Sequence, residues 1–297
     1  MLSRSFRAAK AAPLRQARYL NTGPNVTPHA YLRPLISDRD QPGAEELAGT
    51  MCLVLDRKEA RNALSVQMVH ELREGIAKAA SSNEARLLLL HTPHAGTFCA
   101  GADLRERKSM SETQVALFLD SLRALLGELE ALSMPTIAVV DGFAMGGGLE
   151  MALGCDLRVG GPGTKVSLPE TKLGIIPGAG GTQRLTRTVG VSKAKELIFT
   201  GRRVEGEEAE RIGLLNVLAR EPETAWEAAL LLSRQILTSA PLALKAAKKA
   251  ITFAPQLKLD QGLDLERSEY NTLIPTSDRL EGLKAFAEKR RAVFTGK

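Results

Sequence analysis

The sequence predicts an α/β fold in which parallel strands are joined by crossover helices, followed by a helical C-terminal region. Two observations support this. In the first half of the chain, short apolar runs alternate with amphipathic helical patterns in the order strand, helix, strand, helix, strand. This alternation is typical of a parallel sheet. After residue 220 there are few strand candidates, and four successive segments have helical character.

The first elements follow from local patterns. Residues 50–55 are expected to form a strand. Ser65 is a suitable N-cap for a helix to about residue 80, whose apolar residues recur at helical spacing. Residues 85–91 (ARLLLLH) predict a buried strand. The glycine-containing segment that follows is expected to be a loop that turns helical towards its end.

The next helix has clear start and stop signals. Ser111 and Gln114 form a capping-box pattern before a long amphipathic segment, and Met134-Pro135 is expected to end it. Residues 136–140 predict the following strand. In the last part of the chain, helices are expected over residues 224–238, 240–253, 257–272 and 277–290.

Composition divides the chain of 297 residues into four parts. Residues 1–25 are arginine-rich and contain no acidic residue, which indicates a mitochondrial presequence; a disordered basic tail is the alternative. Residues 26–45 are interpreted as a linker, 46–220 as the α/β core and 221–297 as the helical region. Most of the net charge of +6 lies in the presequence, so bulk charge gives no argument for nucleic-acid binding.

Several classes of site are excluded by spacing. The three cysteines are far apart and form no CxxC pair, and the four histidines lack a metal-ligand pattern, so we expect neither disulfides nor a metal. The segment that starts at Gly178 has Gln183 where a GxGxxG motif needs glycine, and no GxSxG is present. No apolar run is long enough to span a membrane.

One glycine-rich stretch, residues 146–184, contains two candidate acid–base groups. Glu150 follows three glycines and begins an apolar helical run, whereas Glu170 follows a short strand-like run and a proline. Glycines before a helix let a ligand approach the free N–H groups of its first turn. A carboxylate pair beside such donors can move protons on a substrate whose carbonyl becomes an oxyanion. The alternative is a glycine-rich loop with two surface glutamates.

A second glycine-containing element, residues 98–103 (FCAGAD), also follows a buried strand. If the two strand ends lie side by side, two backbone N–H groups point into one pocket and form an oxyanion hole. The alternative for either element is an ordinary strand-to-helix turn.

These motifs together resemble the crotonase, or enoyl-CoA hydratase/isomerase, superfamily. The resemblance is carried by FCAGADL, DGFAMGGGLEMALGCDLRV and SLPETKLGIIPGAGGTQRL, and it extends from residue 46 to the C-terminus. It implies a crotonase-like spiral of β-β-α units with a C-terminal helical trimerisation region. It also implies a homotrimer or homohexamer in the mitochondrial matrix. Three further segments, FCAGADLRER, KELIFTGR and IPTSDRLEGLKAFAEKR, favour the branch of mitochondrial 3-methylglutaconyl-CoA hydratases.

The resemblance assigns roles to individual residues. Ala102 and Gly147 would provide the two N–H groups of the oxyanion hole. Glu150 would deprotonate the water that attacks C3 of an enoyl thioester, and Glu170 would position that water and supply the proton at C2. No cofactor is implied, because CoA is part of the substrate. The positions that match CoA contacts are Lys58, Ala60, Arg61, Ala100, Asp103, Leu104, Arg105 and, from a neighbouring subunit, Phe286 and Lys289. For the basic residues among them, a solvated surface charge is the alternative.

The resemblance leaves the substrate open. It implies hydration of 3-methylglutaconyl-CoA in leucine breakdown, with a straight-chain enoyl-CoA of fatty-acid oxidation as the alternative. Asp56 and Lys58 depart from the usual first motif of the family, which leaves the shape of that loop open. Another class is an RNA-binding protein, since the same branch includes an AU-rich-RNA-binding hydratase. Its RNA binding is attributed to a lysine-rich first helix, whereas the matching segment here has only Arg73 and Lys78 balanced by two glutamates, so we do not expect RNA. A catalytically silent assembly partner is disfavoured by the presence of both catalytic glutamates.

Overall fold

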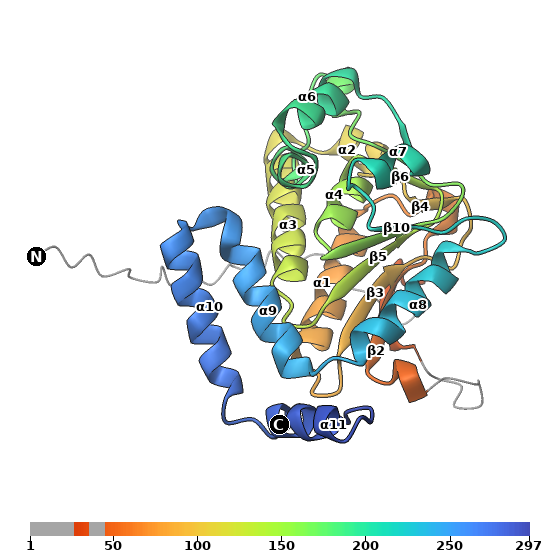
Figure 1. Cartoon of the computed structure of the whole chain (residues 1–297). Coiled ribbons are helices and arrows are strands. Elements are labelled where there is room, and N and C mark those ends of the chain that lie inside the picture. Colours follow the sequence, from red (N-terminus) through yellow and green to blue (C-terminus); the bar gives the residue numbers. More distant parts are fainter. Residues whose placement is uncertain (1–26, 36–44) are drawn as a thin grey trace, which may run out of the picture.

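The computed structural model describes residues 27–35 and 45–297, and the predicted presequence lies outside them (Figure 1). Its largest sheet has six strands in the order β1-β2-β3-β5-β7-β10. All neighbouring pairs are parallel except β1 and β2, which are antiparallel. The strands of this sheet are β1 (Ala30–Pro34), β2 (Thr50–Leu55), β3 (Leu87–His91), β5 (Thr136–Val140), β7 (Leu157–Gly160) and β10 (Val217–Leu218).

A smaller sheet lies at the carboxyl ends of these strands. Its order is β4-β6-β8-β9, and only β9 runs antiparallel to its neighbour. The strands are β4 (Thr97–Cys99), β6 (Phe143–Met145), β8 (Lys165–Ser167) and β9 (Val204–Glu205). Three times in succession, a strand of the large sheet is followed by a strand of the small sheet and then by a helix. This repeat confirms the expected spiral of β-β-α units.

The two faces of the large sheet bury different residues. Along β3, Leu88 and Leu90 belong to one apolar cluster, and Leu87 and Leu89 belong to another. This alternation follows from the period of two along a strand, and it confirms that residues 85–91 contain a strand buried on both faces. The first face is covered by α1 (Val66–Ser81) and α3 (Glu112–Glu130), and the second by α8 (Ala225–Leu237).

The predicted caps are present. The Ser65 side chain accepts from the N–H of Met68, and Ser111 and Gln114 form a reciprocal capping box at the start of α3. Helix α3 ends at residue 130, before the Met134-Pro135 pair. The short helices are α2 (Leu104–Ser109), α4 (Gly147–Leu153), α5 (Gly181–Val189), α6 (Val191–Thr200), α7 (Gly206–Arg211), η1 (Glu45–Leu47), η2 (Lys58–Ala60), η3 (Glu170–Leu173) and η4 (Ala254–Gln256).

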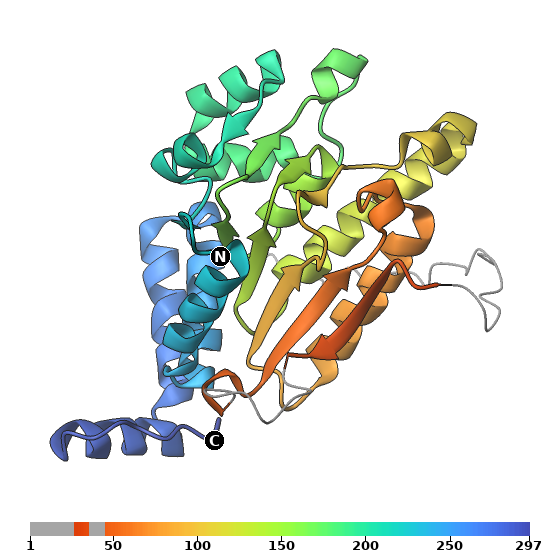
Figure 2. The same cartoon turned by 90° about the vertical axis from the view of Figure 1, so that its right-hand side faces the viewer.

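The remaining helices extend from the core. They are α9 (Pro241–Phe253), α10 (Leu259–Leu273) and α11 (Ser277–Ala287). Together with α8, they account for all four predicted C-terminal helices. Helix α9 is attached to the core by Lys248, whose ammonium donates to Asp156 Oδ2 at 2.7 Å. Helix α11 lies at the opposite end of the molecule from α5 and α6, and Figure 2 shows it projecting away from the sheets. Among the described residues, no helix is both long and apolar enough to cross a membrane.

Two of the predicted segments outside the α/β core contain elements that pack on it. Residues 30–34, within the segment that we interpreted as a linker, form β1 and pair with β2 along its whole length. The hydrophobic pattern of this segment is weak because β1 is an edge strand, with only Ala30 buried. The boundary near residue 220 separates α8 from the sheet on which it packs, since Ala225, Ala228 and Ala229 belong to the core cluster of that face.

Candidate active site

Glu150 lies on α4, which starts directly after β6. All seven residues of this helix are buried, and Glu150 is only 2% exposed. Its Oε1 accepts from the N–H of Ala179 at 2.8 Å and from the N–H of Gly181 at 2.7 Å. Burial raises the pKa of the Glu150 carboxyl, and the N–H groups of Gly181 and Ala179 and the charge of Arg184 oppose that rise.

Glu170 follows β8 and begins the short helix η3. It is also buried, but among the described residues its Oε2 has no hydrogen-bond partner. Burial raises the pKa of Glu170 to about 7, and the nearby charge of Glu150 contributes to the rise. The two carboxyl groups are therefore close enough to interact, and their surroundings differ: Glu150 has two backbone donors, whereas Oε2 of Glu170 has none.

The turn between β6 and α4 passes directly beside Glu170. Gly146 has φ +51°, and a Cβ at this position would lie 3.0 Å from Glu170 Oε1. At Gly148, a Cβ would lie 2.4 Å from the carbonyl oxygen of Cys99. Glycine is therefore required at both positions. The backbone at Gly146 packs directly against the Glu170 carboxylate, and the backbone at Gly148 packs directly against the backbone of Cys99.

The backbone nitrogens of Ala102 and Gly147, which the resemblance assigns to an oxyanion hole, lie close together. Strands β4 and β6 are parallel neighbours, and a Cβ at Gly147 would lie 3.7 Å from the Ala102 nitrogen. A Cβ at Gly101 would lie 3.4 Å from the Gly147 nitrogen. Within the described chain, neither N–H donates to a protein acceptor, although the neighbouring amides of Asp103 and Gly146 do. Two unpartnered backbone donors thus lie near each other at the ends of two neighbouring strands.

The structure brings the two segments of predicted CoA contacts together. Arg61 adopts a left-handed conformation, and its carbonyl accepts from the N–H of Ala100 at 3.0 Å. Lys58, Arg61 and Arg105 form no ion pair among the described residues, and their side chains are exposed. Ala100 and Leu104 are exposed as well, and Ala60 is half-buried. Together these residues form an exposed rim near the two free amides.

Asp103 differs from the other residues of this rim. Its carboxylate is buried, accepts from the N–H groups of Arg105 and Glu106 at the start of α2, and pairs with Arg57 Nη1 at 2.7 Å. These contacts hold the pKa of Asp103 below its usual range in spite of burial. The carboxylate therefore connects the two loops and has little freedom to bind a ligand.

Sequence reasoning missed Arg57 and a second residue of this junction, Asn62. Asn62 has φ +53° and is 1% exposed; its side-chain amide donates to Thr92 Oγ1 and to the Phe98 carbonyl. It also accepts from the N–H of Arg57. The available signal was an asparagine in a loop, since this residue tolerates the left-handed region and bonds to nearby backbone.

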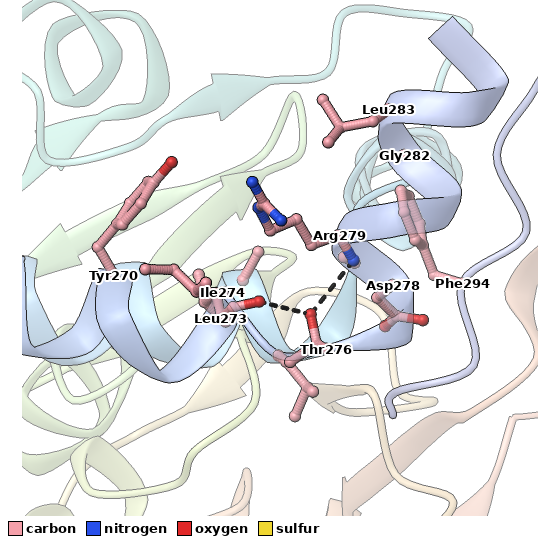
Figure 3. A pocket seen from close by; sticks show the side chains of 12 residues that line it. Tyr270, Leu273, Ile274, Thr276, Asp278, Arg279, Gly282, Leu283 and Phe294 are labelled. Carbon is pink, nitrogen blue, oxygen red and sulfur yellow. Dashed lines mark hydrogen bonds between the residues drawn. The ribbon is translucent and has the colours of Figure 1, made fainter.

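The last two predicted contacts lie elsewhere. Phe286, on α11, is 87% exposed, and Lys289 follows the helix with φ +52°. Helix α11 lies at the far end of the molecule from α5 (Figure 1). A cavity of about 380 Å³ lies between α9, α10 and α11 (Figure 3), and neither Phe286 nor Lys289 lines it. Its lining is mostly apolar, and its buried acid, Asp278, accepts from the N–H groups of Thr295 and Gly296. This cavity is separate from the glutamates.

Among the described residues, no group of three or more histidine, cysteine, aspartate or glutamate side chains is placed to hold a metal ion. Two buried carboxyl groups beside two free amides have the chemistry to transfer protons on a substrate and to stabilise an oxyanion.

Comparison with known proteins gives the family. A family model described as enoyl-CoA hydratase/isomerase matches residues 45–297. "Probable enoyl-CoA hydratase 2, mitochondrial" of Arabidopsis thaliana is 47% identical, over 84% of this chain and 82% of that protein. "Methylglutaconyl-CoA hydratase, mitochondrial" of Homo sapiens is 43% identical, over 85% of this chain and 75% of that protein. The crystal structure of an enoyl-CoA hydratase from Bacillus anthracis has a TM-score of 0.84 and 37% identity, covering 91% of this chain and 100% of that one. The chain belongs to the enoyl-CoA hydratase/isomerase family.

Proposed function

We propose that this protein is an enoyl-CoA hydratase, which adds water across the 2,3 double bond of an enoyl-CoA thioester. The observation that carries the proposal is the pair of buried carboxyl groups in unequal surroundings, beside the free amides of Ala102 and Gly147. Membership of the family supports it.

The unequal surroundings suggest that the two carboxyl groups have different roles in proton transfer. The carboxylate of Glu150 is stabilised by two N–H donors, so Glu150 is the base. Glu170, with a pKa of about 7 and an unpartnered oxygen, is the acid. Water attacks C3 while Glu150 takes its proton, and the π electrons move onto the thioester oxygen as an enolate. The enolate then takes a proton from Glu170 at C2. The amides of Ala102 and Gly147 stabilise the enolate oxygen, and each lowers the activation free energy by about 3 kcal/mol.

The test is hydration of crotonyl-CoA by the purified protein and by Glu150→Gln and Glu170→Gln. Each substitution keeps the shape of the side chain and removes its proton chemistry, so kcat should fall by about 100-fold or more. Binding of a non-reactive acyl-CoA should survive. Glu84→Gln, at an exposed position, is the matched control and should leave the rate unchanged. Near-wild-type turnover in either active-site variant would remove the assignment.

For the acyl group we propose 3-methylglutaconyl-CoA, in leucine breakdown. The motifs of the branch and the relative named methylglutaconyl-CoA hydratase support it. A straight-chain enoyl-CoA is the alternative, supported by the relative named only as an enoyl-CoA hydratase. Measuring kcat/KM for crotonyl-CoA, longer enoyl-CoAs and 3-methylglutaconyl-CoA decides between them. Preference for unbranched chains would overturn the leucine-pathway proposal and leave the mechanism intact.

We further propose a homotrimer or homohexamer in which Phe286 and Lys289 of one subunit complete the CoA site of its neighbour. Support comes from the exposed apolar side chains of α9–α11 and from the position of α11, which carries Phe286, at the far end of the molecule from α5 (Figure 1). Mixing Glu150→Gln subunits with Phe286→Ala subunits should restore some fully competent sites if the contact crosses between subunits. A monomeric mass in solution would refute the assembly.

The proposed location is the mitochondrial matrix, with residues 1–25 as the presequence. The relatives named as mitochondrial support it. Import of the full chain into isolated mitochondria should protect it from external protease, and removal of residues 1–25 should abolish import. Import that does not need these residues would contradict their assignment.

A further inference from the structure

The two N–H groups that bind Glu150 belong to one short turn, residues 179–181, which leads into α5. The side chain of Arg184 packs against this turn. Its Nη1 donates to the carbonyl of Ala179 at 2.9 Å, and its Nη2 donates to Glu130 Oε2 at 2.8 Å. The guanidinium thus connects the turn to the last residue of α3, and the turn connects to Glu150.

Two glycines show how closely this turn is packed. Gly180 has φ +105°, and a Cβ there would lie 2.4 Å from Arg184 Nη1. The guanidinium therefore occupies the space that any other side chain would need. At Gly178, a Cβ would lie 2.8 Å from the Leu119 side chain on α3. The turn is held against α3 at two points, by Leu119 and by the Arg184–Glu130 pair.

Two charged groups interact electrostatically with Glu150: Arg184 on α5 and Glu170 on η3. Glu130 on α3 forms an ion pair with Arg184. Burial raises the pKa of Glu150, while the two N–H donors and then the positive charge of Arg184 lower it. Because the side chain of Arg184 is only 17% exposed, its charge is weakly screened by water.

We propose that Arg184 is a positioning residue for Glu150. It orients the turn so that both N–H groups point at Oε1, and it favours the ionised carboxylate that the proposed hydratase mechanism requires. The inference rests on that mechanism for its catalytic consequence, but the effect on Glu150 exists with or without turnover. Arg184 touches neither the water nor the thioester.

The first test is Arg184→Met, which keeps the apolar stem and removes both the donors and the charge. Loss of orientation should lower kcat by as much as about 100-fold, while binding of a non-reactive acyl-CoA stays within about twofold, since the CoA rim is untouched. The acidic limb of the pH profile should move to higher pH, because Glu150 becomes harder to ionise. The alkaline limb, which belongs to Glu170, should stay in place.

Three variants make the test specific. Arg187→Met removes an exposed arginine one turn along α5 and should change neither rate nor pH profile. Arg184→Lys keeps the charge without the two-pronged geometry, so it should lower kcat with a smaller shift of the acidic limb. Glu130→Gln keeps an acceptor for Nη2 and removes a negative charge, so the acidic limb should move to lower pH. If Arg184→Met does not fold, Arg184→Lys and Glu130→Gln suffice.

Infrared titration of the carboxyl stretch gives a readout that does not depend on activity. The Glu150 band is identified by its loss in Glu150→Gln, and it should titrate at higher pH in Arg184→Met than in wild type. Loss of kcat with an unshifted band and unshifted limbs would reduce Arg184 to a structural role and overturn the inference. A shifted band in a protein without hydratase activity would instead leave Arg184 in place and refute the proposed function.

Discussion

Helix α4 follows β6 and packs against the end of β4, and we call this part of the molecule the crossing. The crossing and the helical region α9–α11 are packed in opposite ways. At the crossing, backbone touches backbone, and a Cβ at Gly148 would overlap the Cys99 carbonyl. In the helical region, Gly262 on α10 has no atom within 4 Å of its potential Cβ. Large apolar side chains such as Phe286 are exposed there. The comparison shows that the site which needs accurate backbone donors is built inside one chain, whereas the helices leave apolar surface for other contacts.

The largest effect is expected at the crossing. Gly148→Ala places a methyl group 2.4 Å from the Cys99 carbonyl oxygen, so α4 has to move away from β4. We expect a loss of about 3 kcal/mol in the free energy of unfolding, together with a large loss of kcat because Gly147 moves with the helix. Denaturant unfolding and crotonyl-CoA hydration measure both. Gly127→Ala on α3, where no atom lies within 4 Å, is the control. Unchanged stability of Gly148→Ala would contradict the close backbone packing.

A smaller effect is expected from the buried acid beside this crossing. The pKa of Glu170 is about 7 in the folded protein and 4.5 is its ordinary value, so its contribution to stability is present below pH 4.5 and is lost as pH rises through 7. Glu170→Gln removes this loss. The variant should be more stable than wild type at pH 8, by at most about 3 kcal/mol, with no such gain at pH 4.5. Unfolding in denaturant at the two pH values measures the difference, and an equal effect at both would contradict the burial of an unpartnered carboxyl.

The smallest effect is expected in the helical region. Gly262→Ala replaces glycine inside α10 without a steric conflict, so the free energy of unfolding should rise by about 0.5 to 1 kcal/mol. The hydration rate should not change. Thermal unfolding followed by circular dichroism measures the gain. If this substitution destabilises the protein, α10 is packed as tightly as the crossing, and the contrast between the two regions fails.

Prediction from sequence worked where the signal was local. The Ser65 cap, the capping box at Ser111 and the buried strand that ends at His91 depend on residues within a few positions of each other. The small sheet was harder to predict. Its strands β4, β6, β8 and β9 have two or three residues each, which is too few to show a hydrophobic period. Three of them, β4, β6 and β8, each follow a longer strand of the large sheet, and these longer strands place them side by side.

The same limit applies to the candidate site. Glu150 and Glu170 were identified from glycines and a proline beside them, and Ala102 and Gly147 from the resemblance. The donors to Glu150 were not identified, since Ala179 and Gly181 lie 29 and 31 residues away in sequence. Their segment had been interpreted only as an uncharged, glycine-rich loop. The buried pairing of Arg57 with Asp103 was missed for the same reason.

By itself, the sequence determined the order of the main strands and helices, the capped helix starts, and the family through three motifs in the correct order. These depend on neighbouring residues, whose steric and hydrogen-bonding preferences act before the chain has folded. Only the tertiary structure decided which carboxyl receives backbone donors, which amides stay free, and that Arg184 and Glu130 meet across 54 positions. Such contacts depend on how distant segments pack, and no short pattern specifies that.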